Sequence, residues 1–328
     1  MKPPLFWYQP NSLIALLLSP LGAIYAAATA RRVKQKPTFK ASVPVICIGN
    51  INAGGTGKTP TAIALAQRLT DLGHAPHIVS RGYGGSEVGP VQVDPATQTA
   101  LDVGDEPLML SAFAPTWVSK DRAQGVQSAQ AAGATVILLD DGFQNPSVNK
   151  DLQIVVVDAV KGFGNGPTMP AGPLREPASA GLIRADAILA IGPEAARTKF
   201  SPLLPQGCAR LDGQLDPLPT GMPWGNLPVL AFAGIGHPEK FFATLKSLGA
   251  DVVRSEALDD HQPFTDALLT RLEGEAKAYG LNLVTTEKDA VRLPDHFRAK
   301  VMVLPVRLSL MDWGPLDAKL AAIGINQK

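Results

Sequence analysis

A glycine-rich segment between an apolar run and a helical pattern constrains this chain more than any other feature. The segment Gly54-Gly55-Thr56-Gly57-Lys58-Thr59 follows the apolar run 43–48 and leads into the helical pattern 61–72. Glycines let backbone N–H groups approach a phosphate, the lysine can reach the outer phosphate oxygens, and the threonine hydroxyl can ligate Mg²⁺. The order strand, loop, helix therefore predicts a P-loop that binds a nucleoside triphosphate.

The loop departs from the usual pattern at one position. The pattern G-x-x-x-x-G-K-[ST] has glycine six residues before the lysine, and Asn52 stands there. Asparagine tolerates the left-handed backbone region better than most residues. The alternatives are a glycine-rich turn of a dinucleotide fold or a purely structural loop, but neither requires Lys-Thr at the start of the helix. The expected nucleotide-binding residues are Asn52, Ala53, Gly54, Gly55, Thr56, Gly57, Lys58 and Thr59.

Length and composition suit a globular protein with two domains. The chain has 328 residues, of which 45% are hydrophobic and 18% charged, so disorder is not expected. Its two cysteines, Cys47 and Cys208, provide neither a disulfide framework nor a metal-ligand cluster. The net charge is +1, yet the first acidic residue is Asp71. The basic charge is therefore concentrated in an N-terminal arm, which argues against a nucleic-acid-binding face.

That arm combines aromatic, apolar and basic segments. Phe6-Trp7-Tyr8 precedes an uncharged stretch, 12–30, and the basic segment 31–36 follows it. This order suits a membrane interface with anionic lipid and argues against a signal peptide, whose positive charge would come first. Because Pro20 and Gly22 interrupt the stretch, we expect a monotopic or re-entrant anchor rather than one spanning helix. A buried helix packed on the following domain is the alternative.

Apolar runs and helical patterns then alternate along the chain, which indicates an α/β fold with a mostly parallel sheet and helices on both faces. The expected strands are 43–48, 77–80, 116–119, 136–139, 152–157 and 187–191, and the expected helices are 60–72, 106–113 and 121–132. Ligands of such sheets bind at the carboxyl ends of the strands.

A proline- and glycine-rich stretch, 202–228, precedes a second α/β series. In this series we expect strands beginning at residue 228 and at 282–285 and 301–306, with helices at 238–248 and 265–278. The sequence thus predicts an anchor (1–40), a domain of the P-loop NTPase type (41–225) and a smaller α/β domain (226–328).

Two carboxylates stand where a metal ligand of a P-loop protein is expected. Asp140 and Asp141 directly follow the buried run 135–139, so they lie at the carboxyl end of a strand, where a carboxylate can hold Mg²⁺ opposite Thr59. An Asp pair before Gly142 could instead form a turn and a helix cap. Spacing alone does not choose between the two aspartates.

Asp105 and His261 are two further candidates for chemistry. Asp105 opens a helix within Gly104-Asp105-Glu106-Pro107, where it could be a cap or a general base. From the local sequence alone, the helix-cap role of Asp105 is favoured. His261 follows Asp259-Asp260, carboxylates that could raise its pKa and fix its tautomer, although most histidines in polar loops are simply solvated.

Three arginines are candidate phosphate contacts. The segment 161–184 is longer than a structural connection needs, which is typical of functional loops, and it contains Arg175. Arg81 and Arg122 also lie near predicted strand ends, and the arginine fork suits phosphate geometry.

Taken together, these segments resemble the tetraacyldisaccharide 4′-kinase family, the lipid A 4′-kinases of Gram-negative bacteria. The resemblance spans nearly the whole chain, arm included. Its ordered set of blocks is far more specific than any one of them: Gly49-Asn50, Gly54 to Pro60, Ser80 to Tyr83, Gly104 to Pro107, Asp140 to Gln144, Pro170 to Pro177, Asp260-His261 and Val284 to Asp289.

The resemblance implies transfer of the γ-phosphoryl group of ATP, with Mg²⁺, to the 4′-hydroxyl of a tetraacylated glucosamine disaccharide 1-phosphate, forming lipid IVA. Because that acceptor stays in a bilayer, it places the enzyme at the cytoplasmic face of the inner membrane, held by lipid contacts of the arm. It further implies that Asp105 is the base, that His261 orients it, and that Lys58 assists catalysis. Closure of a hinge would bring Asp105 and His261 together. Gln144, Glu176, Arg81, Arg122 and Arg175 become candidate substrate contacts.

A membrane-associated P-loop ATPase that acts as a switch is the main alternative. A GTPase is disfavoured because the guanine-reading pattern Asn/Thr-Lys-x-Asp is missing from the sequence. We expect no nucleic-acid partner and no obligate protein partner.

Overall fold

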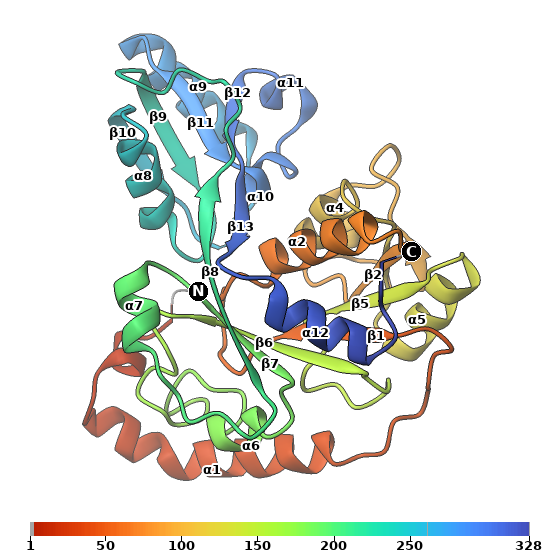
Figure 1. Cartoon of the computed structure of the whole chain (residues 1–328). Coiled ribbons are helices and arrows are strands. Elements are labelled where there is room, and N and C mark those ends of the chain that lie inside the picture. Colours follow the sequence, from red (N-terminus) through yellow and green to blue (C-terminus); the bar gives the residue numbers. More distant parts are fainter. Residues whose placement is uncertain (1–2, 261, 328) are drawn as a thin grey trace.

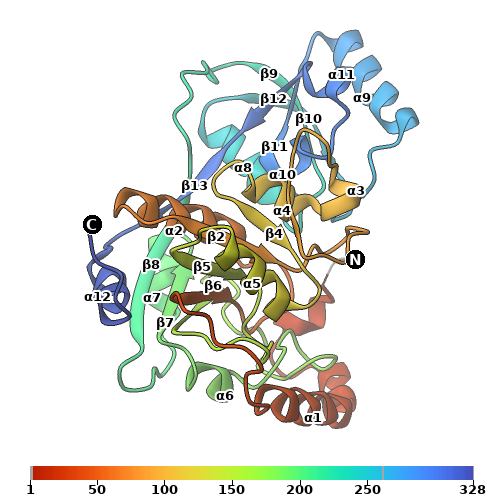
Figure 2. The same cartoon turned by 90° about the vertical axis from the view of Figure 1, so that its right-hand side faces the viewer.

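The computed structural model describes residues 3–260 and 262–327, which form a large and a small α/β unit (Figure 1). Two perpendicular views place the N-terminal helix at the end of the large unit farthest from the small unit (Figures 1 and 2). The fold predicted from the sequence is confirmed: a mostly parallel sheet with helices on both faces, a smaller α/β unit and an apolar N-terminal helix.

The large sheet carries the P-loop. Its strands are β1 (Val45–Gly49), β2 (Pro76–Ser80), β3 (Val91–Gln92), β4 (Thr116–Val118), β5 (Val136–Asp140), β6 (Leu152–Asp158), β7 (Ala187–Ile191), β8 (Ala209–Pro217) and β13 (Val306–Leu310). Their order is β13-β8-β7-β6-β1-β5-β2-β4-β3, and the edge strands β13 and β3 run antiparallel to their neighbours. Strands β1, β2, β5 and β7 are buried throughout, which explains their continuous apolar sequences.

Helices cover both faces of the large sheet. One face packs against α2 (Lys58–Asp71), α4 (Asp105–Leu110) and α12 (Gly314–Ala322), and the other against α5 (Arg122–Ala131) and α6 (Ala178–Leu182). The short helices α3 (Ala100–Val103) and α7 (Glu194–Lys199) complete this unit. Alternate residues of β1 point to opposite faces, so Ile46 joins the first core and Cys47 the second.

The small unit is a parallel sheet of its own. Its strands are β9 (Pro228–Ala233), β10 (Asp251–Ala257), β11 (Asn282–Thr286) and β12 (Val301–Leu304), in the order β10-β9-β11-β12. Helix α8 (Pro238–Ser247) covers one face, and α9 (Asp266–Tyr279) and α11 (Asp295–Arg298) cover the other. Helix α10 (Glu287–Ala290) follows β11 directly, at the end of the sheet that faces the P-loop domain (Figure 1).

Three segments differ from the sequence expectation. The run 301–306, predicted as one strand, is divided at Pro305 into β12 of the small sheet and β13 of the large one, because proline has no N–H to continue a ladder. The stretch 202–228 contains strand β8, which pairs with β13. Strand β10 was not predicted because it is an exposed edge strand rich in charged residues. The predicted domain boundary at residue 225 stays a prediction. Strand β13 and helix α12, which come after it in the chain, lie on the large sheet and not on the small one.

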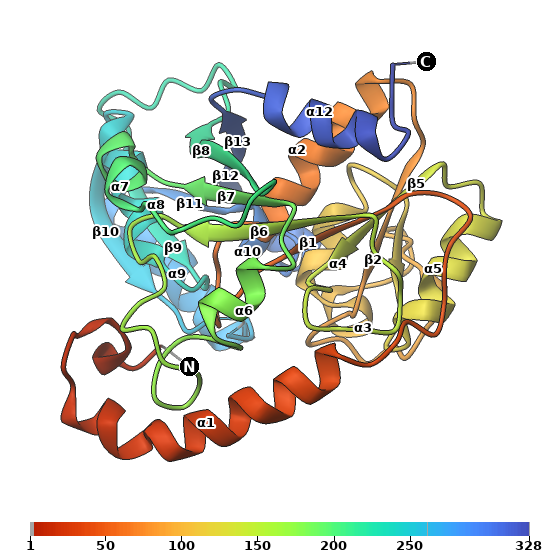
Figure 3. The ribbon, with the colours of Figure 1, turned by 60° about the horizontal axis from the view of Figure 1, so that its bottom comes forward.

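The N-terminal arm is one helical segment after a short turn. It comprises the 3₁₀ turn η1 (Leu5–Tyr8) and helix α1 (Leu13–Val33), which runs along one edge of the molecule (Figure 3). The predicted interruption is wrong, since α1 continues through Pro20. Proline removes the N–H that would bond to the carbonyl of Leu16, and the Ser19 hydroxyl donates to that carbonyl instead at 2.7 Å.

Candidate active site

The P-loop connects the buried end of β1 to the start of α2. Gly54 and Gly57 have φ values of 100° and 99°, in the left-handed region where a side chain would be strained. The Asn50 amide braces the loop from inside by donating to the carbonyl of Gly54 and the hydroxyl of Thr56, both at 3.2 Å. The loop therefore holds its backbone open toward the solvent side, with Gly54 and Gly55 exposed.

Asn52 has a different role from the one its sequence position suggested. Among the described residues with positive φ that are not glycine, Asn52 does not appear, so its tolerance of that region is not used. Its amide donates to the carbonyl of Gly162 at 2.9 Å, and its backbone bridges to Leu174. Asn52 thus ties the P-loop to the long segment 161–184.

Asp140 and Asp141 lie beside the P-loop because β5 is the parallel neighbour of β1, with Asp140 opposite Ile48. The Lys58 ammonium is 3.8 Å from Asp141, and Arg175 donates to both of its carboxylate oxygens, at 2.8 and 3.1 Å. Asp140 is 2% exposed and accepts a hydrogen bond from the Ser80 hydroxyl at 3.0 Å.

The pKa values of the two carboxylates are shifted in opposite directions. Burial, together with the charges of Glu106 and Asp141, raises the pKa of Asp140 to about 6. Burial would also raise the pKa of Asp141, but Lys58 and Arg175 outweigh it and hold that pKa below its ordinary value. At neutral pH the negative charge of Asp140 is therefore electrostatically costly, and a bound cation would relieve that cost.

The donor set fits Mg²⁺. The Oδ1 atom of Asp140 is buried and has no hydrogen-bond partner among the described residues, and an unpaired buried carboxylate oxygen is costly unless it binds a cation. Thr59 stands in the first turn of α2, where the P-loop ends. Mg²⁺ commonly takes one or two protein oxygens and completes its shell with phosphate and water.

Three of the predicted substrate contacts, Arg122, Gln144 and Glu176, form hydrogen bonds to protein groups of the site. The buried Arg122 guanidinium donates to the backbone carbonyls of Asp140 and Asp141 at 2.8 and 3.3 Å, and burial lowers its pKa. The Gln144 amide donates to the carbonyl of Asn50 and to Glu176, at 2.8 and 2.9 Å.

Glu176, the third, also forms a paired contact with Arg184. Arg81 is exposed at the end of β2. Of the five candidates, Arg175 and Arg81 present guanidinium groups that are partly or fully exposed.

Asp105 lies where the two units meet. It is the first residue of α4, and the residue at the N-cap position is Gly104, so the cap reading of Asp105 is wrong. Its carboxylate is 3.2 Å from the Nε atom of Arg292 in the small unit. Next to it, Glu106 pairs with Lys288 at 3.4 Å, and Lys288 pairs with Asp260 at 3.7 Å. The predicted partner of Asp105, His261, lies outside the described residues.

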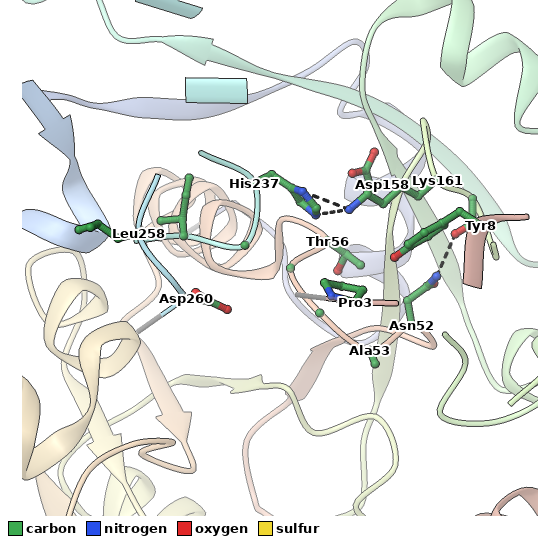
Figure 4. A pocket seen from close by; sticks show the side chains of 15 residues that line it. Pro3, Tyr8, Asn52, Ala53, Thr56, Asp158, Lys161, His237, Leu258 and Asp260 are labelled. Atoms are coloured by element: carbon green, nitrogen blue, oxygen red, sulfur yellow. Dashed lines mark hydrogen bonds between the residues drawn. The ribbon is translucent and has the colours of Figure 1, made fainter. Parts of the chain in front are cut away.

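A pocket separates the P-loop from the small unit (Figure 4). Lys161 and His237 point toward one another across it and are in contact, with Thr56 and Ala53 of the P-loop nearby. Burial, with the charges of Lys161 and Lys240, lowers the pKa of His237 and so favours the neutral ring. Lys240 in turn pairs with Asp158 at 2.7 Å. The small unit therefore brings charged groups to the mouth of the P-loop.

The segment 161–184 joins the arm to this site. The Trp7 indole donates to the carbonyl of Pro170 at 2.9 Å, and the backbone N–H of Asn165 donates to the carbonyl of Trp7 at 2.8 Å. The Thr168 hydroxyl donates to the carbonyl of Gly22 in α1 at 2.7 Å. Because Arg175 belongs to the same segment, the arm and the Asp141 carboxylate are connected through one loop.

Sequence reasoning missed Arg292, Lys161 and His237. Arg292 lies three residues after the block ending at Asp289, but nothing local shows that it reaches α4. Lys161 begins the long segment that the sequence singled out, and His237 precedes α8. Their positions depend on how the two units meet, which no local pattern encodes.

Comparison with known proteins matches nearly the whole length of this chain. The family model described as tetraacyldisaccharide-1-P 4′-kinase matches residues 14–324. The tetraacyldisaccharide 4′-kinase of Jannaschia sp. (strain CCS1) is 60% identical over 320 residues, 97% of this chain and 98% of that protein. The tetraacyldisaccharide 4′-kinase of Dinoroseobacter shibae is 57% identical over 332 residues, 99% and 98% of the two chains.

A solved structure agrees with this match. The crystal structure of LpxK from Aquifex aeolicus in complex with ATP aligns with a TM-score of 0.77 and 26% sequence identity, covering 95% of this chain and 99% of that chain. The matched region includes the P-loop, the Asp pair, both α/β units and almost all of α1. On this evidence the chain belongs to the tetraacyldisaccharide-1-P 4′-kinase family.

Proposed function

We propose that this chain transfers the γ-phosphoryl group of ATP to the 4′-hydroxyl of a tetraacylated glucosamine disaccharide 1-phosphate, forming lipid IVA in lipid A biosynthesis. The observation that carries the proposal is a family match over residues 14–324 in a chain whose P-loop lies beside the buried Asp140 and the half-buried Asp141.

The large sheet holds the phosphates. The backbone N–H groups of residues 53–57 would hold the phosphates, and Lys58 would neutralise charge on the outer phosphate oxygens as it develops. Thr59 and Asp140 would hold Mg²⁺, which neutralises charge on the triphosphate when it is bound. Arg175 keeps Asp141 oriented and leaves part of its guanidinium for the acceptor or the transferring group.

Asp105 acts on the acceptor. It accepts the proton of the 4′-hydroxyl as the oxygen attacks the γ-phosphorus, and His261 orients it. Asp105 is 8% exposed, and its position at the start of α4 faces the small unit. Transfer therefore takes place where the two units meet.

The arm holds the enzyme at the cytoplasmic face of the inner membrane. Large apolar side chains of α1 are exposed, including Leu13 at 75% and Leu17 at 80%, whereas the small residues Ala15, Gly22 and Thr29 face the protein. This distribution is the reverse of a soluble helix and suits a helix lying in the lipid interface, with Arg31 and the following basic residues near anionic headgroups.

The arm is tested by the charged variant Leu17→Glu, which retains the protein-facing residues. Cell fractionation should move this variant from the membrane fraction toward the soluble fraction, and Ile24→Glu, on the same exposed face, is expected to act in the same way. The variant Leu203→Glu, at an exposed leucine outside the arm, is the control. A Leu17→Glu variant that stays with the membrane as wild type does would contradict the anchor.

The proposed reaction is tested with purified protein, labelled ATP and tetraacyl disaccharide 1-phosphate in detergent. We expect label in a lipid whose mass has increased by one phosphate, and no label when the offered lipid already carries a 4′-phosphate. Free phosphate released without a labelled lipid would instead favour the membrane-associated ATPase switch.

A further inference from the structure

We propose that Arg292 is a positioning residue for phosphoryl transfer: it fixes the carboxylate of Asp105 and makes the alignment of this base depend on contact between the two units. The proposal rests on the role of Asp105 in the proposed function. Arg292 follows α10 in the small unit, whereas Asp105 begins α4 in the large one.

The geometry of Arg292 is that of a buried connector. Its Nε atom lies 3.2 Å from an oxygen of Asp105, and the two side chains are 8% and 10% exposed. One terminal nitrogen donates to the carbonyl of Gln262 at 2.9 Å. The other donates to the carbonyl of Gly234 at 3.3 Å and contacts Asp289. A single guanidinium therefore spans Asp105 and two loops of the small unit.

The small unit fixes this guanidinium independently of Asp105. Asp289 is fully buried and is held in place by the N–H of Gly234, at 3.1 Å to each oxygen, and by the Thr286 hydroxyl at 2.7 Å. The Phe264 ring lies beneath the guanidinium, 4.8 Å from its centre. With its terminal nitrogens engaged in this way, Arg292 holds its Nε atom beside Asp105, and the two groups form a buried ion pair that lacks hydrogen-bond geometry.

The chemistry explains why the residue is an arginine. A guanidinium offers several donors in a rigid plane and stays charged, so it can serve two carboxylates and two carbonyls at once. A lysine would supply the charge but not the fork. Gln262 is the residue after His261 in the sequence, so the same side chain also ties the segment beside the predicted partner of Asp105 to the base.

The first test compares turnover of Arg292→Met and Arg292→Lys with wild type. Because Arg292 acts through the base, we expect Arg292→Met to lower kcat by about 30-fold while the KM for ATP changes by less than about twofold. Arg292→Lys should recover part of the loss. The control Arg298→Met removes a surface pair with Asp295 in the same unit and should leave kcat unchanged.

The second test is a double-mutant cycle. In an Asp105→Ala background, Arg292→Met should cause no further loss of kcat, because the group it positions is gone. If Arg292→Met lowered kcat by the same factor in the Asp105→Ala background as in wild type, the positioning role would be overturned. A normal kcat for Arg292→Met would overturn it as well.

Urea unfolding of the same variants separates failure of this proposal from failure of the proposed function. If wild type makes no labelled lipid, the kinase assignment fails, yet the stability cycle still tests the contact. We expect Asp105→Ala and Arg292→Met to be non-additive in unfolding free energy, and additive losses would overturn the contact. If Arg292→Lys lost as much stability and as much kcat as Arg292→Met, Arg292 would have a structural role only.

Discussion

The two sides of the proposed site are built in different ways. On the large sheet, the P-loop and the aspartate pair follow the carboxyl ends of the adjacent parallel strands β1 and β5, which the ladder pairs at Ile48 and Asp140. On the other side, Arg292 and Lys288 reach the site from a second sheet through ion pairs with α4. The first half is built within the large unit, whereas the second exists only where the units meet. Binding of ATP and alignment of the acceptor should therefore be separable.

The largest effect is expected on the large-sheet side. Lys58→Ala removes the cation that faces Asp141 and the phosphates, and we expect phosphoryl transfer to fall about 10³-fold. Nucleotide binding, measured by equilibrium dialysis, should weaken too, because the same lysine holds the ground-state phosphates. The matched variant Lys36→Ala, in the basic segment of the arm, should retain both activities in detergent. Unchanged nucleotide binding by Lys58→Ala would contradict the proposal that the large-sheet side binds ATP.

Asp140 allows the electrostatics of the large-sheet side to be tested through the pH dependence of protein stability, without an activity assay. Burial and the neighbouring carboxylates raise its pKa from 3.8 to about 6 in the folded protein. Stability from a group with a raised pKa is fully present below its unfolded value, near pH 3.8, and is lost as the pH rises through 6. At pH 8 in EDTA, the ionised carboxylate should cost about 3 kcal/mol, and Asp140→Asn should remove that cost.

The measurement is urea unfolding of Asp140→Asn at pH 8 and near pH 4. We expect the variant to be more stable than wild type at the higher pH and similar to it at the lower. Asp251→Asn, at an exposed position of the small unit, serves as the control and should show no such difference. A wild type that is as stable as Asp140→Asn at pH 8 would contradict the electrostatic account of the pair.

The smallest effect is expected at the rim of the contact between the units. Lys288 pairs with Glu106 and Asp260 at 3.4 and 3.7 Å, but these side chains are 20 to 37% exposed and water screens them. Lys288→Met should lower kcat/KM only about threefold, and the difference should shrink with added salt. Lys300→Met, which removes a pair within the small unit, is the control. A loss as large as that of Arg292→Met would show that the rim matters as much as the buried connector.

The same contrast explains what the sequence could predict. The P-loop and the aspartate pair follow from local patterns, because each sits where a buried strand ends and β1 and β5 are adjacent. The role of Asp105 came from resemblance, since local physics favoured a cap that the structure assigns to Gly104.

Long-range features lay beyond local patterns. The return of the chain to the large sheet after Pro305 and the reach of Arg292 across the contact depend on pairings between distant segments. The course of α1 through Pro20 depends on one hydroxyl that takes over a missing donor.

The division between the two sides is tested most directly by Asp105→Ala, in which nucleotide binding and transfer are measured on the same sample. We predict an ATP dissociation constant within about twofold of wild type and a fall in kcat of about 10²- to 10⁴-fold, as expected for loss of a base that acts only during transfer. Wild-type transfer by this variant, or a loss of ATP binding as large as the loss of transfer, would contradict the account.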